Sequence, residues 1–393
     1  MSTYIGPPVE GKHFIGRIKE VTNLLSIIMA GMHILLSAPR RVGKTSIAKR
    51  VLYLLRQANW SGVYVSVEGA NDEVVFAQRI IKELKEQNNL WTKSKDSFLE
   101  VFKNANFDIE ILGSKLKFKD NPNDVAHFIE TLGKAINSIK GNFIIVIDEL
   151  PVFLASLEKK EQGAERVEAL LNTLRSFRQY DSGEEYEKKD KVVWFFCGSI
   201  SLENYASQRN LSYTINDVKA CKVGAYSNEE AIEYLTTIAK REDVNLTDDI
   251  RDYIINKVGW PIPFYLGIVF DAASEQADSA PLTLSHIEDG YSASLKTYKK
   301  DFDLWLQRLQ LHITKYDLHI ELLKLIAIHK IVDLDFIKAW KLNSEWKEMK
   351  ELNLLAILDL LEADGYTVFE NGVYQYRSPL VKDYIINKFH LSK

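Results

Sequence analysis

The sequence predicts an α/β fold built on a parallel β-sheet, and three features of the chain support this prediction. Apolar runs alternate with helical patterns from His33 to Val223, which is the order expected when helices connect parallel strands. A short loop ending in Gly-Lys-Thr follows the first apolar run and precedes a helical pattern, Ile47–Leu55. A later run, Phe143–Ile147, is followed directly by two acidic residues. Because ligands bind at the carboxyl ends of parallel strands, the loop and the acids mark the expected site.

Five strands are predicted where apolar runs are bounded by turn-forming or charged residues. In chain order they are His33–Ser37, Gly62–Val67, Asn142–Ile147, Val192–Cys197 and Lys219–Val223. The third run has no polar alternation, which indicates a strand buried on both faces of the sheet. Helical patterns between the strands include Val74–Gln87, Asp124–Ile139 and Glu165–Tyr180. Alternating apolar and polar residues around Gly113 predict a β-hairpin inserted at about residues 106–119.

From Ser227 onward the pattern is helical, and Glu230 three residues later predicts a helix cap there. Near the end of the chain, Asn-Gly between two alternating runs predicts a β-hairpin over Tyr366–Arg377. Helices followed by such a hairpin indicate a winged-helix domain. We therefore expect a core at residues 1–226, a helical lid at 227–297 and a winged-helix domain at 298–393. The helices predicted in this half are Glu229–Lys240, Thr247–Lys257, Pro263–Ser274, Asp301–His312, Leu318–His329, Asp335–Lys341 and Lys347–Leu361.

The loop after the first strand has the residues of a phosphate-binding loop. Backbone N–H groups of such a loop wrap the β-phosphate, and the following helix adds the partial positive charge of its N-terminus. Lys44 would reach the β- and γ-phosphates, and Thr45 would bind Mg²⁺ through its hydroxyl. Ala38 stands where the usual pattern has its first glycine, and a basic loop without a ligand is the alternative. The residues of the loop are Ala38, Pro39, Arg40, Arg41, Val42, Gly43, Lys44, Thr45 and Ser46.

The two acids after the Phe143–Ile147 run complete a candidate catalytic site. Asp148 is placed to hold Mg²⁺, directly or through water, and Glu149 is placed to polarise an attacking water. The alternative is a strand that simply ends in solvated acids. The presence of the Gly-Lys-Thr loop earlier in the chain favours the catalytic interpretation.

Composition limits the classes of protein to consider. The formal net charge of the chain is −4 at pH 7, so no global basic field indicates nucleic acid as a partner. Cys197 and Cys221 lack any metal-ligand spacing and are expected to be buried thiols in a reducing compartment. The segment Met1–Lys12 has no signal-peptide pattern, and no apolar stretch is long enough to span a bilayer. We therefore expect a cytoplasmic protein without membrane contact.

Three further motifs accompany the loop and the Asp-Glu strand. They are the hydrophobic-Gly-Arg-x-x-Glu segment at Phe14–Glu20, the strand ending in Gly-Ser at Phe196–Ser199 and the turn Gly259–Pro261. In these five motifs the chain resembles the STAND and archaeal-type ATPases, a branch of the AAA+-like P-loop superfamily, and is most similar to bacterial ATP-binding proteins of unassigned function. The likeness extends from Phe14 to Leu266, and the winged-helix end also fits the layout of the group.

The resemblance implies a sheet of order 5-1-4-3-2 and a site for ATP or ADP with Mg²⁺. It places the adenine between the Phe14–Arg17 segment and the Gly259–Pro261 turn. It assigns phosphate and Mg²⁺ contacts to Lys44 and Thr45, Mg²⁺ binding to Asp148, and water activation to Glu149. Ser199 takes the role of γ-phosphate sensor, and Gly16, Arg17 and Pro261 bind the base and ribose.

Several of these motifs also have purely structural interpretations. Gly16-Arg17 could be a loop before a helix that begins at Ile18, and Ser199 could cap the helix Leu202–Ser207. The Gly259–Pro261 turn could simply end one helix and begin another. Arg40 and Arg41 could grip phosphate, a partner or acidic neighbours. The sequence does not choose between these alternatives.

The resemblance breaks at the arginine that completes a neighbour's site in related ATPases. The corresponding stretch, Ser212–Lys219, has no arginine, although Arg209 lies a few residues earlier. Arg209, Arg40 and Arg41 remain the candidates for that role, and the alternative is that no arginine of the chain fills it. Because an arginine finger contributes about 10³–10⁵ in rate, its absence predicts slow intrinsic hydrolysis. Slow hydrolysis favours a switch over a processive motor.

Three functions compete. The first is an ATP-dependent switch that changes conformation or assembly to control a protein partner or a homo-oligomer. The second is a DNA-associated ATPase of a mobile element or defence system, and the third is a small-molecule kinase, which Glu149 disfavours. From Leu311 to Lys393 the chain has 12 acidic and 11 basic residues, and the candidate recognition helix Lys347–Leu361 carries acids, so DNA is the less favoured partner. GTP is disfavoured because Asn256-Lys257-Val258-Gly259 lacks the base-reading acid.

Overall fold

The computed structural model describes residues 8–105, 107, 122–179, 190–199, 201–278, 280–309, 316–329, 331–343 and 354–392. The hairpin predicted at about residues 106–119 lies outside these ranges except for Phe107. The chain forms two compact units. The sheet unit comprises Ile18–Ser37 and Lys44–Val223, and the helical unit comprises Met1–Arg17, Ala38–Gly43 and Gly224–Lys393. The threefold division into core, lid and winged-helix domain stays a prediction.

The sheet unit is built on five parallel strands, as predicted. Their order is β2-β3-β4-β1-β5, which is the expected 5-1-4-3-2 counted from the other edge. Every residue of β3 is buried, as its uninterrupted apolar sequence indicates. In register, Asp148 at the end of β3 lies opposite Ser66 on one side and Cys197 on the other. The strands are β1 (Ile34–Ser37), β2 (Ser61–Ser66), β3 (Phe143–Asp148), β4 (Val192–Gly198) and β5 (Lys219–Lys222).

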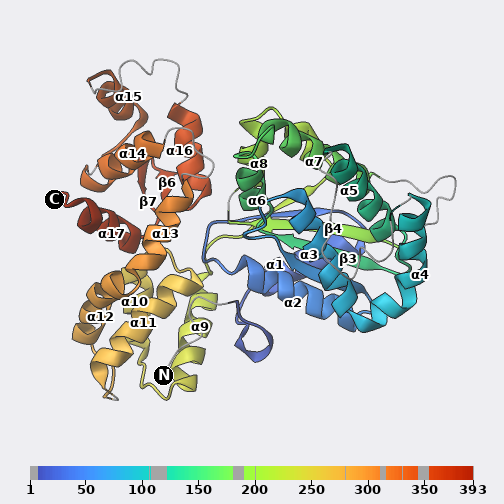
Figure 1. Cartoon of the computed structure of the whole chain (residues 1–393). Helices are drawn as coiled ribbons and strands as arrows, with labels where there is room; N and C mark the ends of the chain where they lie inside the picture. Colours follow the sequence, from blue (N-terminus) through green and yellow to red (C-terminus); the bar gives the residue numbers. More distant parts are fainter. Residues whose placement is uncertain are drawn as a thin grey trace. The chain divides into compact units, whose positions relative to one another are not determined.

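Helices cover both faces of this sheet, with α1 and α2 along one face and α5 and α7 along the other (Figure 1). This arrangement follows from the strand order, because the β1–β2 and β3–β4 connections cross the sheet in opposite directions. Helix α2 buries Ile47, Val51 and Leu55, which recur on one helical face. The helices are α1 (Ile18–Met29), α2 (Lys44–Gln57), α3 (Glu73–Glu86), α4 (Asn88–Asn104), α5 (Pro122–Asn137), α6 (Leu150–Leu157), α7 (Gly163–Arg178) and α8 (Leu202–Ser207).

The helical unit contains the second half of the chain. The predicted cap at Ser227 is a full capping box, because Ser227 accepts from the N–H of Glu230 and the Glu230 carboxylate accepts from the N–H of Ser227. Within this unit, α13 runs between the group α9–α12 and the group α14–α17 (Figure 1). The helices are α9 (Asn228–Arg241), α10 (Asp248–Val258), α11 (Pro263–Ala277), α12 (Leu284–Thr297), α13 (Lys299–Leu309), α14 (Tyr316–Ile328), α15 (Leu334–Asn343), α16 (Leu354–Ala363) and α17 (Pro379–Phe389).

The C-terminal hairpin predicted from Asn-Gly is present. Strands β6 (Thr367–Glu370) and β7 (Val373–Tyr376) pair antiparallel, and Asn371 and Gly372 between them both have positive φ. Positive φ at both central residues gives a two-residue turn whose twist matches the strands. Tyr376 packs this hairpin onto α14, because its hydroxyl donates to the Leu323 carbonyl at 2.7 Å.

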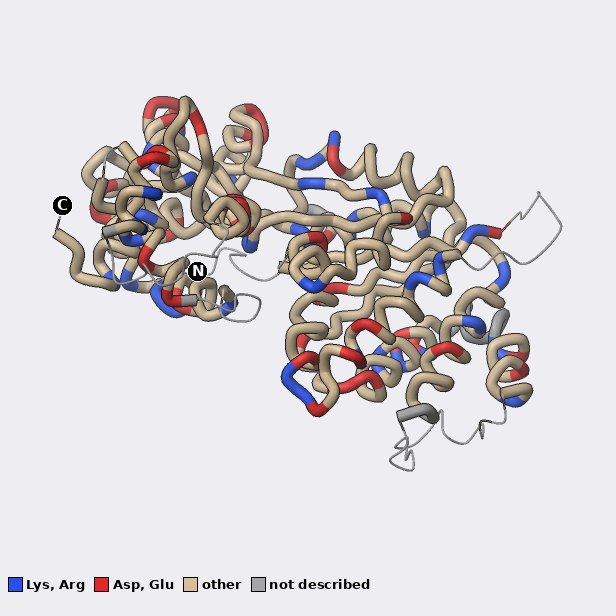
Figure 2. The backbone as a smooth tube through the Cα atoms, turned by 90° about the horizontal axis from the view of Figure 1, so that it is seen from above, with Lys and Arg blue, Asp and Glu red and all other residues tan. Residues whose placement is uncertain are grey.

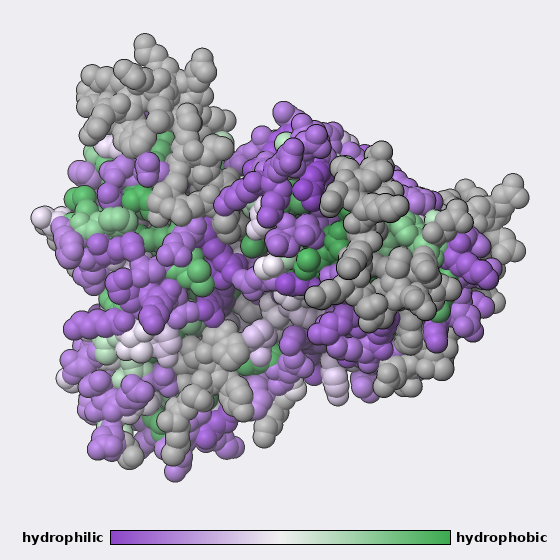
Figure 3. Space-filling model, in the orientation of Figure 1, coloured by the Kyte–Doolittle hydropathy of each residue, from purple (hydrophilic) through white to green (hydrophobic). Residues whose placement is uncertain are grey.

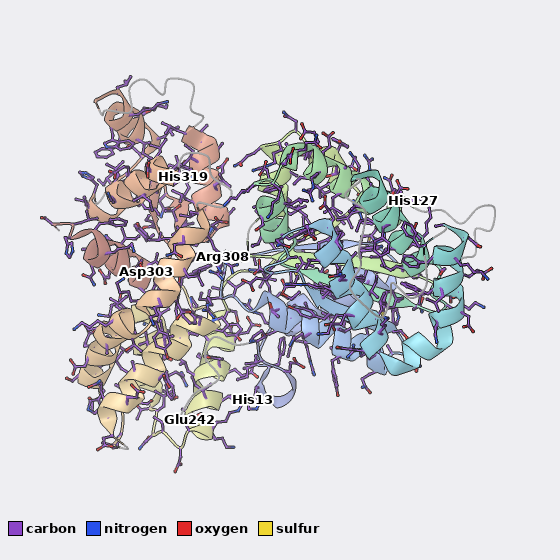
Figure 4. The ribbon with its side chains drawn as sticks, viewed as in Figure 1. His13, His127, Glu242, Asp303, Arg308 and His319 are labelled. Carbon is purple, nitrogen blue, oxygen red and sulfur yellow. The ribbon has the colours of Figure 1, made fainter. Side chains whose placement is uncertain are left out.

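A carboxylate on α13 ties that helix to the last helix of the chain. Asp303, labelled in Figure 4, accepts from Lys299 at 2.6 Å and also from Tyr384 and Lys388 of α17. Although partial burial raises the pKa of Asp303, the hydrogen bonds from the two lysines and the tyrosine hold it well below its usual range. The carboxylate is therefore charged at neutral pH and links α13 to α17.

On the face shown in Figure 3, the hydrophobic residues among those described form small separate groups between hydrophilic ones. Within the described ranges, no helix has both the length and the apolar character needed to cross a membrane. Cys197 and Cys221 are buried free thiols, as the sequence predicts.

Candidate functional site

The Asp148 carboxylate is the centre of the candidate site in the sheet unit. Asp148 is the last residue of β3, and only 4% of its surface is exposed. Its Oδ2 accepts from the Thr45 hydroxyl at 2.8 Å and from the Tyr64 hydroxyl. Its Oδ1 accepts from the Cys197 thiol at 3.2 Å and from the Glu149 N–H at 3.0 Å. Four hydrogen-bond donors, two on each oxygen, therefore satisfy this nearly buried carboxylate.

Glu149 lies beside it in an unusual backbone conformation. Its φ of +64° is the left-handed region, and it is the residue immediately before α6. The Glu149 carboxylate accepts from the N–H of Ser199 at 3.0 Å and from the Ser199 hydroxyl at 2.8 Å. The cap of α8 is Ser201, which accepts from the Asn204 N–H, so the alternative in which Ser199 caps that helix is wrong. Ser199 instead holds the carboxylate of Glu149.

The phosphate-loop segment connects the two units along the chain. Residues Ala38–Gly43 belong to the helical unit, and Lys44 opens α2 in the sheet unit. Lys44 and Ser46 are buried, at 7% and 8% exposure, and Gly43 has a φ of +99°. A glycine at this φ lets the chain turn into a helix, and the N-terminus of a helix is a favourable position for an anion.

Two neighbours of Asp148 are kept protonated. Burial, followed by the charge of Asp148, raises the pKa of the Tyr64 hydroxyl far above its ordinary value. Burial and the same charge raise the pKa of the Cys197 thiol. Both groups therefore act as donors to Asp148 throughout the neutral pH range.

The donor set suits Mg²⁺. A hydroxyl from Thr45 and a carboxylate from Asp148 lie within hydrogen-bond distance of each other, and Mg²⁺ in nucleotide sites takes one or two such oxygens together with phosphates and water. Across the described residues, no group of three His, Cys, Asp or Glu side chains could hold a metal ion. The oxygens of Thr45 and Asp148, which lie 2.8 Å apart, remain the candidate metal ligands.

Arg17 forms a second cluster, within the helical unit. Its side chain is almost completely buried, at 2% exposure, and its φ is +63°. The guanidinium donates to the carbonyls of Val42 at 3.1 Å, Gly224 at 2.7 Å and Ala225 at 3.1 Å. It also lies 4.5 Å from the centre of the Tyr226 ring. Arg17 thus ties the phosphate loop, through Val42, to the segment that leads into α9.

Tyr226 brings together the residues expected to bind the base and ribose. Its hydroxyl donates to the Ile15 carbonyl at 3.0 Å, and its N–H donates to the Pro261 carbonyl at 3.0 Å. A Cβ at Gly16 would lie 3.1 Å from the Tyr226 ring. The Gly16-Arg17 pair and Pro261 therefore meet around one tyrosine, which the sequence analysis missed because a tyrosine before a helix cap carries no signal of its own.

The loop residues Pro39 and Arg41 lie against residues from the second half of the chain, within the same unit. Arg41 forms an ion pair with Asp301 on α13 and lies 4.6 Å from the centre of the Phe264 ring. Gly365, with a φ of +84°, approaches the loop so closely that a Cβ there would lie 2.7 Å from the Cβ of Pro39. Only glycine fits this position without displacing the loop.

The three candidate arginine fingers have different surroundings. Arg209 forms a two-bond ion pair with Glu158, at 2.6 Å for each bond, and its guanidinium lies 3.8 Å from the centre of the Tyr205 ring. Arg41 is paired with Asp301. Arg40 is partly buried beside it in the loop. In this structure, therefore, Arg209 and Arg41 are each engaged by an acid of their own chain.

Comparison with known proteins gives matches among solved structures alone. No protein-family model matches the chain, and no curated protein matches its sequence. A Walker-type ATPase of Pyrococcus abyssi aligns with 97% of this chain and 98% of its own, at 15% identity and a TM-score of 0.63. The ORC1 protein of Aeropyrum pernix, solved in complex with DNA, aligns with 97% of this chain and 94% of its own, at 14% identity and a TM-score of 0.44. The RuvB branch migration motor of Thermotoga maritima aligns with 97% of this chain and 96% of its own, at 12% identity and a TM-score of 0.41. From the first of these and the sheet order, the chain has the fold of a Walker-type P-loop ATPase.

Proposed function

We propose that the protein is an ATP-binding switch that hydrolyses ATP slowly and uses nucleotide binding to control a partner. Binding rests on the segment Ala38–Ser46, in which the loop N–H groups and Lys44 hold phosphates. Thr45 and Asp148 would hold Mg²⁺, which neutralises phosphate charge when bound. Glu149 would orient the attacking water, and Gly16, Arg17 and Pro261 would frame the base and ribose around Tyr226.

The contact between Arg41 and Asp301 is the observation that carries the switch. Arg41 belongs to the loop that holds phosphate, whereas Asp301 belongs to α13 in the C-terminal half. A phosphate bound by Arg41 would compete with the Asp301 carboxylate for the same guanidinium. Nucleotide binding would therefore weaken the ion pair between the loop and α13, and the conformation of the C-terminal helices would depend on whether nucleotide is bound.

Slow hydrolysis is supported by the state of Glu149. One oxygen of its carboxylate accepts from both the N–H and the hydroxyl of Ser199. Glu149 would have to leave these donors to reach a water, and each hydrogen bond to a charged group contributes about 1.5–3 kcal/mol. The ion pair of Arg209 with Glu158 also supports slow hydrolysis, because this candidate arginine finger already binds an acid of its own chain.

A protein partner or a second copy of the chain is favoured over DNA. Helix α16, the described part of the candidate recognition helix, has no Lys or Arg and carries Asp359 and Glu362. Along the described backbone, basic and acidic residues are interspersed (Figure 2). Duplex binding needs clustered cations, so α16 lacks the footprint for phosphate contacts.

Hydrogen exchange on the full chain tests the switch. The Glu149→Gln variant would hold Mg-ATP without turnover, and we expect faster exchange in Lys299–Leu309 when ATP is added. Peptides from β3 provide the internal control, since this strand is buried throughout. ATP turnover of the wild-type protein, measured with and without duplex DNA, completes the test. Unchanged exchange in Lys299–Leu309 together with strong stimulation by DNA would favour the DNA-associated ATPase instead.

A further inference from the structure

We propose that Tyr64 and Cys197 are positioning residues for Mg²⁺, because they fix the two oxygens of the Asp148 carboxylate from opposite sides. This inference rests on the proposed binding of Mg-ATP. Thr45 and Glu149 belong to the two motifs from which the site is predicted, whereas Tyr64 and Cys197 lie outside both motifs and add two further donors. Together the two side chains would set the Mg²⁺ concentration at which the site fills.

The strand register explains how both donors reach one carboxylate. Tyr64 lies on β2 opposite Val146, two positions before the residue that pairs with Asp148, and its long side chain extends to Oδ2. Cys197 lies on β4 directly opposite Asp148, and its short side chain reaches Oδ1 at 3.2 Å. Donors held on strands are more precisely placed than donors on loops. The central strand therefore presents its acid between two rigid neighbours.

The surroundings of each donor keep it aimed at the carboxylate. The Tyr64 ring lies 5.4 Å from the Lys49 ammonium on α2, which favours its present orientation. The Cys197 side chain is fully buried and has no access to water. An Asp148 carboxylate without these two donors would retain the Thr45 hydroxyl on Oδ2 and the Glu149 N–H on Oδ1, so each oxygen would be held by one donor in place of two and the carboxylate would be less firmly oriented. Outer-shell hydrogen bonds of this kind typically change metal affinity by about 10–100-fold.

A packing role makes a different prediction from a positioning role. If Tyr64 and Cys197 only filled space, their substitutions could change thermal stability where volume is lost, but they would leave the Mg²⁺ dependence of ATP-analogue binding unchanged. Tyr64→Phe removes one oxygen and keeps the ring. Cys197→Ala removes the thiol donor, whereas Cys197→Ser replaces it with a hydroxyl donor. Tyr53→Phe, at an exposed position on α2, and Cys221→Ala, at the other buried thiol, are the matched controls.

The test is a Mg²⁺ titration of fluorescent ATP-analogue binding, with thermal midpoints recorded for every variant. We expect Tyr64→Phe and Cys197→Ala each to raise the half-saturating Mg²⁺ concentration by about tenfold, the lower end of the usual outer-shell effect. Cys197→Ser and both controls should match the wild type, and binding of the analogue in EDTA should be equal in all proteins.

The outcomes separate this inference from the proposed function. If the wild type binds the analogue and Tyr64→Phe and Cys197→Ala titrate with Mg²⁺ as it does, the positioning role is refuted and the proposed function stands. If Cys197→Ser loses Mg²⁺ affinity as Cys197→Ala does, donation by Cys197 is refuted. If the wild type binds no analogue at any Mg²⁺ concentration, the proposed function is wrong and this inference fails with it.

Discussion

Replacing Asp301 by asparagine should tighten nucleotide binding. Asp301 pairs with Arg41 of the phosphate loop, and the two side chains are 31% and 28% exposed. A pair this exposed is partly screened by solvent and contributes about 0.2–1 kcal/mol. If bound phosphate must displace the carboxylate, Asp301→Asn removes that competition, and the dissociation constant should fall by about 1.4- to 5-fold.

Equilibrium titration with a fluorescent ATP analogue measures this difference. Asp289→Asn on α12 is the matched control, since it removes the same charge from an exposed position in the same unit. The wild-type dissociation constant divided by that of Asp301→Asn should fall toward one in about 1 M salt, where charges are screened within about 3 Å. If Asp301→Asn binds the analogue no more tightly than Asp289→Asn does at low salt, competition between phosphate and Asp301 for Arg41 is refuted.

Two further predictions concern catalysis and pH. Glu149→Gln should keep Mg-ATP affinity while lowering single-turnover hydrolysis by about 10²–10⁴-fold, the usual contribution of a positioned general base; unchanged hydrolysis would remove Glu149 from catalysis. His33 accepts from the Trp194 N–H at 3.2 Å, its other ring nitrogen lies 3.1 Å from the Arg178 carbonyl, and burial lowers its pKa from 6.5. The unfolded chain therefore binds this proton more readily, so the stability that neutral His33 contributes is present above about pH 6.5 and is lost as the pH falls below it. The urea midpoint of the wild type should be lower at pH 5.5 than at pH 7.5, and His33→Gln should reduce this difference. An equal difference in midpoint in both proteins would exclude His33 as the cause.

The sheet could be predicted from the sequence because its strands are bounded apolar runs. The predicted Asn142–Ile147 and the observed β3 differ by one residue at each end, since apolar side chains fill both faces of that strand. Helix α6 was missed for a related reason. All of its residues except Ser156 are buried, so it has no alternation of polar and apolar faces, and Pro151 suggests a break although it lies in the first turn.

Within the site, local motifs were readable and long-range contacts were not. Thr45 and Asp148 meet as the loop and the acidic strand indicate. The contact of Tyr64 with Asp148 depends on the pairing of two strands that are distant in sequence, and in the sequence Tyr64 is only one aromatic residue of a strand. The Arg41–Asp301 pair joins residues 260 positions apart, and no periodicity links them. Such contacts follow from tertiary packing, which a single sequence does not display.

The central claim is that the segment Ala38–Ser46 binds the phosphates of ATP through Lys44. The most direct measurement is equilibrium binding of a fluorescent ATP analogue, with Mg²⁺, to the wild type, to Lys44→Ala and to the control Lys82→Ala, which changes an exposed lysine on α3. We predict saturable binding to the wild type and to Lys82→Ala, and a loss of more than about tenfold, or 1.4 kcal/mol, in Lys44→Ala with an unchanged circular dichroism spectrum. An affinity of folded Lys44→Ala within about threefold of the wild type would contradict the account.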